Sequence, residues 1–189
     1  MRYFRHVSAT ARAVVWLTSG ACASGGTSVT TAGSVATVSS PAAAPPQALA
    51  SARQLVVVTT PDWNATTGTL RRFTRDDLSA AWQAVASPVP VVIGRTGLAW
   101  AEESLASAST QPVKHEGDGR SPAGAFPLDT AFGFVWGGPS STTAGCTALD
   151  AGQLEALLRW LDRARRPAFA QLPAAEYDRL RSAWRLPPP

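Results

Sequence analysis

The sequence predicts a mainly β domain with helices, of the α+β class. Residues 54–60 form a β-branched run with the length of a buried strand. Two further apolar runs, 89–93 and 98–101, lie on either side of a turn that contains two glycines. The leucines of residues 154–161 recur instead at helical spacing. Strands are therefore expected first along the chain, and helices near its end.

The first 23 residues have the layout of a secretory signal. Arginines precede a short apolar run, 13–17, and the small residues Ala21-Cys22-Ala23 follow it. We expect export after cleavage before Ser24, with lipid modification of Cys22 as an alternative. The run is far shorter than the roughly 20 apolar residues that a membrane span needs, so no transmembrane span is expected.

Residues 24–52 are expected to be a flexible tether, and residues 53–189 the folded domain. The tether consists mostly of Ser, Thr, Ala, Gly and Pro, and has no charged or aromatic residue. The formal net charge is +4, from 17 basic and 13 acidic residues. Three of the basic residues and no acidic one lie in the signal segment, so the domain itself is nearly neutral. Its charge therefore implies no nucleic-acid partner.

The strand at 54–60 should end at Pro61 and pair with residues 69–73 as a hairpin. Thr74 then predicts the start of a helix that ends before Pro88. A loop that contains a short strand is the alternative for that segment. The helix would carry one apolar stripe, which consists of Leu78, Ala81, Trp82 and Val85.

The runs 89–93 and 98–101 are expected to form a second hairpin, with Pro90 at a sheet edge. Near the end of the chain, residues 168–172 predict a closing strand. Residues 174–184 then predict a short last helix, whose apolar side consists of Tyr177, Leu180 and Trp184.

Cys146 ends a run of small residues, 140–145, and precedes a helix start. Asp150 and Gln153 have the spacing of a capping box, so the helix should begin at Ala151. The chain has 2 Cys, and processing at Cys22 leaves Cys146 without a partner in an oxidising compartment. Small neighbours leave its sulfur accessible, as a nucleophile requires, whereas a buried structural cysteine is the alternative.

The block 114–126 is rich in glycine and charge, and its turns should bring charged side chains together. Its spacing matches neither a phosphate loop nor a calcium loop, so no metal or other cofactor is expected. Lys114, Asp118 and Arg120 are the candidate substrate-binding residues of this block. A purely structural turn is the alternative for each of them.

Three passages of the chain resemble the L,D-transpeptidase (YkuD-type) catalytic domain. They are the opening strand 55–63, the block 116–126 and the Thr-Ala-Gly-Cys-Thr-Ala passage 143–148. The resemblance extends from about residue 53 to the C-terminus. It implies a β-sandwich catalytic domain, with a helix after the cysteine loop and a short C-terminal helix, that acts on peptidoglycan stem peptides during cell-wall cross-linking.

The same resemblance assigns roles to residues near the cysteine. Cys146 matches the nucleophile, which would form a thioester with the stem peptide before an amine resolves it. The backbone N–H groups of Gly145 and Thr147 match an oxyanion site. The implied protein is a transferase of the periplasm or cell wall that needs no cofactor, and we expect a monomer.

The chain departs from this family in two places. The family keeps a histidine shortly upstream of the cysteine, where this sequence has Phe134-Val135-Trp136-Gly137-Gly138. The chain has 2 His, and since His6 lies in the signal, only His115 remains as a substitute base. Phe126 and Cys146 are also only 20 positions apart, a span in which the family has further strands. We therefore expect an internally shortened domain.

These observations leave three hypotheses. The first is an exported L,D-transpeptidase-like acyltransferase that uses Cys146. The second is a catalytically impaired relative that binds peptidoglycan or a partner, since the upstream histidine is absent. The third is a cysteine amidase or hydrolase, in which water replaces the acceptor amine. His115 is a substitute base in the first hypothesis and an ordinary surface residue in the second.

Overall fold

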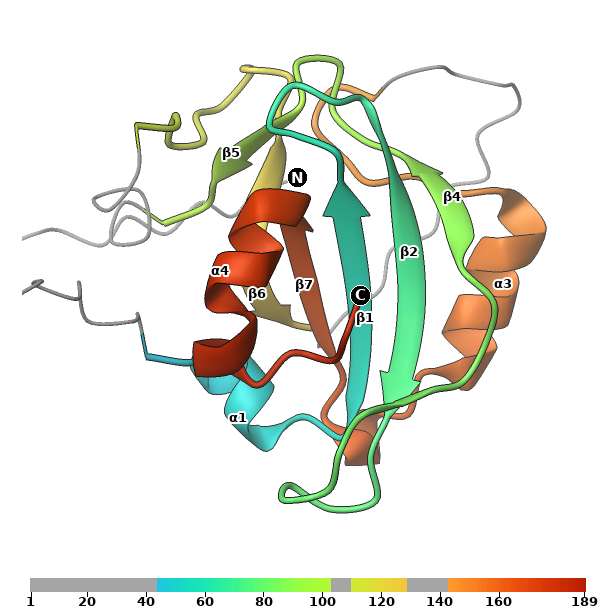
Figure 1. Ribbon diagram of the computed structural model, residues 1–189. Coiled ribbons are helices and arrows are strands. Elements are labelled where there is room, and N and C mark those ends of the chain that lie inside the picture. Colours follow the sequence, from blue (N-terminus) through green and yellow to red (C-terminus); the bar gives the residue numbers. More distant parts are fainter. Residues whose placement is uncertain (1–43, 103–109, 129–142) are drawn as a thin grey trace, which may run out of the picture. The chain divides into compact units, whose positions relative to one another are not determined.

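The computed structural model describes residues 44–102, 110–128 and 143–189, all of which belong to one compact unit. The helices and strands follow one another in the order α1 (Gln47–Ser51), β1 (Gln54–Thr60), β2 (Thr67–Thr74), β3 (Gln83–Ala84), β4 (Val89–Val92), β5 (Leu98–Trp100), β6 (Ser121–Pro127), α3 (Ala151–Trp160), a 3-10 turn (Arg163–Arg165), β7 (Ala168–Pro173) and α4 (Ala174–Trp184) (Figure 1). The predicted signal and the part of the predicted tether before Ala44 lie outside this description.

The described strands form one mixed sheet of seven strands, which confirms the α+β class. The order is β3-β2-β1-β7-β6-β5, and β4 pairs with β2 beside this path. β1 is antiparallel to β2 and parallel to β7, while β6 is antiparallel to β7 and parallel to β5. The predicted first hairpin and the predicted strand at 168–172 are both present. In the described residues there is thus one layer of strands, where the family resemblance implied a sandwich.

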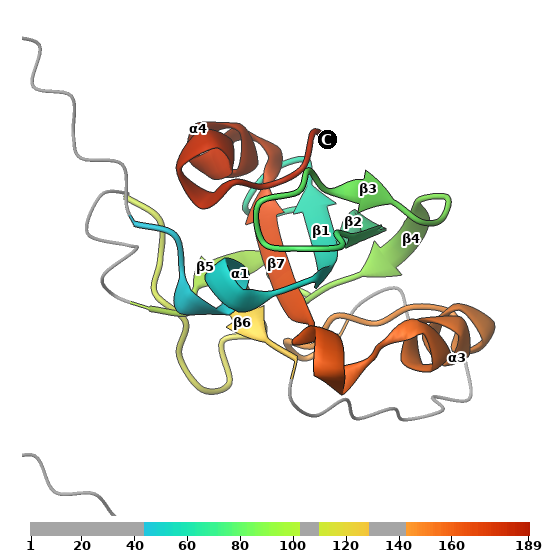
Figure 2. The ribbon, with the colours of Figure 1, turned by 90° about the horizontal axis from the view of Figure 1, so that it is seen from below.

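Helices cover both faces of this sheet, as the view from below shows (Figure 2). On one side, Gln54 and Arg72 donate hydrogen bonds to carbonyls of α3. On the other side, α4 packs against β1 and β7 through Tyr177, Leu180 and Trp184, all buried as predicted. Because successive strand residues point to opposite faces, a strand between two helices must be apolar on both. This explains the unbroken apolar run in β1.

The helix predicted after Thr74 is absent, and the alternative, a loop with a short strand, is confirmed. β2 continues to Thr74, and the chain then loops before β3 pairs back onto β2. Two side chains stabilise this non-helical conformation. The Asp77 carboxylate accepts hydrogen bonds from the Ser79 and Ala80 amides, which competes with helix formation. The Arg75 guanidinium donates to the carbonyl of Leu78 within the loop and to the carbonyls of Leu49 and Ala52 outside it.

The second predicted hairpin is wrong in its pairing, although both of its strands exist. β4 pairs with β2, and β5 pairs in parallel with β6. The chain does turn between them, since the Gly97 amide donates to the Gly94 carbonyl. Gly94 however lies against the backbone of Gly119–Ser121, where a Cβ would be 2.3 Å from the Gly119 carbonyl oxygen. This contact directs β5 towards β6 instead of β4.

The folded domain begins before its predicted boundary at residue 53. Residues 44–52 were assigned to the tether, but α1 forms within them, and Leu49 and Ala52 are buried. Two of the three carbonyls that Arg75 binds, those of Leu49 and Ala52, belong to these same residues, so the buried Arg75 side chain fixes this segment to the sheet. In the ranges that the structure describes, no helix combines the length and hydrophobicity needed to cross a bilayer.

Candidate functional site

Cys146 lies on a segment, residues 143–148, that we call the cysteine loop. The loop runs beside residues 92–95 and is hydrogen-bonded to them at both ends. At one end the Arg95 amide donates to the Thr143 carbonyl at 2.8 Å, and at the other Val92 and Ala148 exchange two bonds of 2.8 Å. The position of the loop is therefore set by the end of β4, and not by its neighbours in the sequence.

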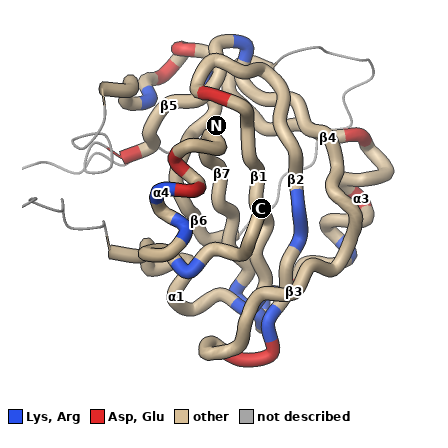
Figure 3. The backbone as a smooth tube through the Cα atoms, viewed as in Figure 1, with Lys and Arg blue, Asp and Glu red and all other residues tan. Residues whose placement is uncertain are grey.

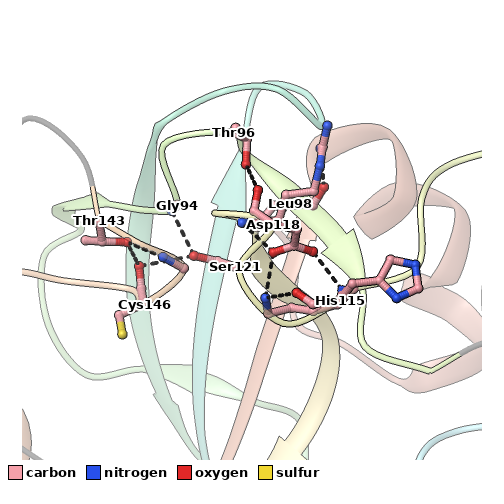
Figure 4. Close-up of polar contacts among 11 residues, drawn as sticks. Gly94, Thr96, Leu98, His115, Asp118, Ser121, Thr143 and Cys146 are labelled. Carbon is pink, nitrogen blue, oxygen red and sulfur yellow. Dashed lines mark hydrogen bonds and ion pairs between the residues drawn. The ribbon is translucent and has the colours of Figure 1, made fainter.

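The backbone of Cys146 is fixed, whereas its side chain is exposed. Its carbonyl accepts hydrogen bonds from the hydroxyls of Ser121, at 3.1 Å, and of Thr143. Ser121 is fully buried and also accepts the Gly94 amide, so one hydroxyl joins three segments. The Cys146 sulfur points away from Ser121 (Figure 4). The alternative of a buried structural cysteine is thereby excluded.

Gly145 has a conformation that only glycine adopts without strain. Its φ is 134°, and a Cβ there would lie 2.9 Å from the Arg120 carbonyl oxygen. The loop can therefore approach the block 114–126 only because this side chain is missing. The Gly145 amide, one of the two predicted oxyanion donors, donates to the Thr143 hydroxyl at 3.3 Å.

Thr147, the other predicted oxyanion residue, connects the loop to the sheet. Its hydroxyl donates to Gln171 Oε1 at 2.6 Å, and Gln171 Nε2 donates to the Pro122 carbonyl at 2.9 Å. Gln171 is fully buried in β7. The loop is thus supported from a central strand, and Asp150 then caps α3 by accepting the amides of Gly152 and Gln153. The predicted helix start at Ala151 is confirmed.

The charged residues of block 114–126 gather around Asp118, next to the cysteine loop. The carboxylate accepts hydrogen bonds from Lys114 Nζ, at 2.7 Å, and from the backbone amides of His115 and Arg120. Burial raises the pKa of Asp118, but these three bonds outweigh it and lower the pKa to about 2. The carboxylate is therefore charged at any physiological pH, and holds the Lys114 ammonium in place.

The structure brings Lys114 close to the cysteine loop. Its Nζ lies 3.7 Å from the position of a Cβ on Gly145, the residue before Cys146. Arg120 is turned inward, where it donates to the Leu98 carbonyl at 2.7 Å. Of the three candidate binding residues, Lys114 is thus the one whose charge lies beside the loop, whereas Asp118 and Arg120 support the turn.

His115 is not brought together with Cys146. Its side chain is exposed, and its ring lies beyond Asp118 and points away from the sulfur (Figure 4). Its backbone amide, and not its imidazole, makes the hydrogen bond to Asp118. The passage 134–138, where the family that the sequence resembles has a histidine, lies outside the described residues. In this arrangement His115 is a surface residue and not the partner of a dyad.

Sequence reasoning missed Ser121, Thr143 and Gln171, which together hold the cysteine loop. The signal available was weak, because a hydroxyl or amide in a turn-rich segment is ordinary. Only burial marks Ser121 and Gln171 as special, and burial follows from the tertiary structure. The described residues hold no group of three or more His, Cys, Asp or Glu that would bind a metal ion.

The fold and site together define a mixed α+β domain with an exposed thiol, that of Cys146, on a loop held by the hydroxyl groups of Ser121 and Thr143. No known protein family, no curated protein and no solved structure matches the chain.

Proposed function

We propose that this chain is an exported L,D-transpeptidase-like acyltransferase that acts on peptidoglycan stem peptides through Cys146. The observation that carries the proposal is the exposed Cys146 side chain on a backbone held by Ser121 and Thr143. A nucleophile must be accessible to its substrate and yet held in position, and this loop meets both conditions.

The spatial arrangement of the sequence passages adds support. The passages 116–126 and 143–148, which carry the resemblance, lie against each other through Ser121, Arg120 and Gly145. We also propose that this chain is a shortened form of the family's domain. The single sheet would be the part of that domain that the chain retains.

The proposed reaction has two steps. The Cys146 thiolate attacks a peptide carbonyl of the donor stem, the amide bond breaks, and the terminal D-residue leaves as an amine that takes up a proton. The amine of an acceptor stem then attacks the thioester and loses a proton, which forms a new amide and returns the thiolate. The Lys114 ammonium beside Gly145 would attract a substrate carboxylate.

A second candidate, an impaired relative that binds peptidoglycan or a partner without turnover, rests on the position of His115. Because its ring points away from the sulfur, no imidazole of the described residues stands ready to take the thiol proton (Figure 4). Loss of a base costs such enzymes several orders of magnitude in rate. The two candidates agree on the site and differ in turnover.

The decisive experiment uses a carbapenem, a β-lactam that acylates the nucleophile. The exported chain would carry Cys22→Ser, so that Cys146 is the only thiol, and would be incubated with the drug and analysed by intact mass. We expect a single adduct that Cys146→Ala abolishes and His115→Ala leaves in place. Iodoacetamide labelling confirms beforehand that the thiol is accessible.

Product analysis then separates the remaining hypotheses. An acyltransferase releases D-alanine from a tetrapeptide stem and forms a cross-linked product when an acceptor stem is present. A hydrolase releases D-alanine and forms only the shortened stem. If labelling shows an accessible thiol, yet neither a carbapenem adduct nor D-alanine appears, the acyltransferase proposal is overturned. Retained muropeptide binding would then favour the impaired relative.

Export itself is tested by the mass of the chain recovered from the envelope. Cleavage before Ser24 and lipidation at Cys22 give different masses, while a full-length cytoplasmic chain would contradict export.

A further inference from the structure

A groove of about 700 Å³ lies at the end of α4, where the loop after β2 and the C-terminal residues meet. Its walls come from two segments that are distant in the sequence, 75–82 and 181–188. Trp82 joins these segments, since its indole nitrogen donates to the Arg185 carbonyl at 3.0 Å. The lining consists of Arg75, Leu78, Ser79, Ala80, Ala81, Trp82, Arg181, Ser182, Arg185, Leu186, Pro187 and Pro188.

This lining contains three arginines and no acidic residue. Basic and acidic positions both occur along α4 and in the loop after β2 (Figure 3), but the acidic ones do not line the groove. Arg75 is occupied, because it donates to three carbonyls and stacks 4.2 Å from the centre of the Trp82 ring. Arg181 and Arg185 are exposed, and among the described residues neither has a carboxylate within ion-pair distance.

The positive charges are close enough to affect one another. Burial lowers the pKa of Arg75, and the neighbouring Arg185 guanidinium lowers it further. The acid that opposes this effect is Asp77, whose carboxylate accepts hydrogen bonds from Ser79 and Ala80. An anion in the groove would relieve the repulsion between the arginines.

The groove also exposes apolar surface beside the charges. Leu78 is 48% exposed, and the Trp82 indole is half-buried. Leu186, Pro187 and Pro188 also line the groove, and of these three only Pro188 is exposed. A purely polar polyanion, such as a sugar or glycerol phosphodiester chain, would cover this apolar surface without contacting it favourably. A peptide with both carboxylates and apolar side chains matches the two kinds of surface together.

We propose that this groove binds a short acidic peptide segment, whose carboxylates pair with Arg181 and Arg185 and whose apolar side chains contact Leu78 and Trp82. The site includes none of the residues of the cysteine loop and does not rest on the acyltransferase proposal. It adds a peptide-docking surface at the C-terminal end of α4.

The probe is a fluorescein-labelled peptide of alternating Glu and Leu, whose binding to the full chain is followed by anisotropy. The test variant is Arg181→Ala with Arg185→Ala. We expect affinity to fall about tenfold or more, because two charge-assisted contacts are lost. Leu78→Ser should weaken binding by a smaller factor. Cys146→Ala should not change it, which separates this site from the acyltransferase proposal.

The control is a second double variant, Arg159→Ala with Arg179→Ala, which removes the same charge. Each of these arginines is paired with a glutamate of its own helix, and neither lines the groove. Equal loss of affinity in test and control variants would show attraction by net charge alone and overturn the proposal. Tighter binding of a glycerol phosphate oligomer than of the peptide would overturn it in favour of a phosphodiester ligand. Thermal unfolding of each variant verifies that it is folded.

Discussion

β1 and the cysteine loop are both held by other segments of the chain, but by different interactions. β1 pairs with β2 and β7, and its side chains from Leu55 to Val58 are at most 2% exposed. The cysteine loop lies at the surface and is held by hydroxyls and by a few backbone hydrogen bonds. Apolar burial makes the first region stable, while the second keeps the Cys146 side chain exposed. Substitutions should therefore affect folding in one region and thiol reactivity in the other.

The largest expected effect is on the β1 side of this comparison. Leu55→Ala removes a fully buried side chain from the central sheet and should lower the free energy of unfolding by about 2–5 kcal/mol. Urea denaturation measures this change. The matched control is Leu158→Ala on α3, where the side chain is 38% exposed and the loss should stay within about 0.5 kcal/mol. Equal losses would contradict the assignment of the core.

In the cysteine loop, Gly145→Ala should have the next largest effect. The new Cβ would meet the Arg120 carbonyl oxygen at 2.9 Å, and the φ of 134° is strained for alanine. Backbone strain of this kind costs about 1–3 kcal/mol, so the loop should move away from the block 114–126. We expect slower carbapenem acylation of Cys146, measured by intact mass against time.

Gly117 provides the control for that substitution. Its φ is 76°, also in the region that favours glycine, but no atom lies within 4 Å of a Cβ there. Gly117→Ala should therefore show a small loss of stability and unchanged acylation. If it slowed acylation as much as Gly145→Ala, contact between the loop and Arg120 would not be the cause.

Ser121→Ala sharpens the comparison, because Ser121 is buried like β1 but acts on the loop. The change leaves the Gly94 amide without its acceptor and takes one donor from the Cys146 carbonyl. An unsatisfied buried group costs about 1–3 kcal/mol, and we expect the lower part of this range because Thr143 still donates to that carbonyl. Hydrogen exchange should increase at Gly94 and in residues 143–148, while β1 stays protected. Increased exchange throughout the sheet would contradict this local role.

Sequence reasoning succeeded where local pattern decides the structure. β1, β2, β7, α3 and α4 follow from apolar periodicity and from the Asp150 cap. It failed between Thr74 and Pro88, where a helical stripe was present but the contacts of Arg75 with distant carbonyls and of Asp77 with nearby amides decided the outcome.

The residues of the candidate site could be singled out from the sequence, but their geometry could not. The sequence marks Cys146 as a candidate nucleophile and the block 114–126 as a run of crowded turns. Lys114 lies beside Gly145, whereas His115 points away from the cysteine loop (Figure 4). This difference depends on how the chain turns at Asp118. The pairing of β4 with β2 could not be predicted either. Gly94 contacts residues 119–121, which prevents the predicted hairpin, and this contact exists only in the folded chain.

The smallest expected effect is a pH dependence that arises at Asp118. Its pKa is lowered to about 2 in the folded chain from 3.8, so its contribution to stability is complete above about pH 4 and is lost as the pH falls towards 2. Asp118→Asn removes this titration. The difference in melting temperature between the native chain and the variant should therefore shrink as the pH is lowered from 5 to about 2.

Asp76→Asn serves as the control, since the Asp76 side chain is 91% exposed and its pair with Arg165 is long, at 3.8 Å. Exposed pairs of this kind contribute little, so the melting temperature of this variant should follow that of the native chain across the same pH range. A parallel pH profile for Asp118→Asn would show that the carboxylate does not hold the turn. In that case Lys114 would lie beside the cysteine loop without support from Asp118. The block 114–126 would then count, like the cysteine loop, as an exposed and weakly held part of the molecule.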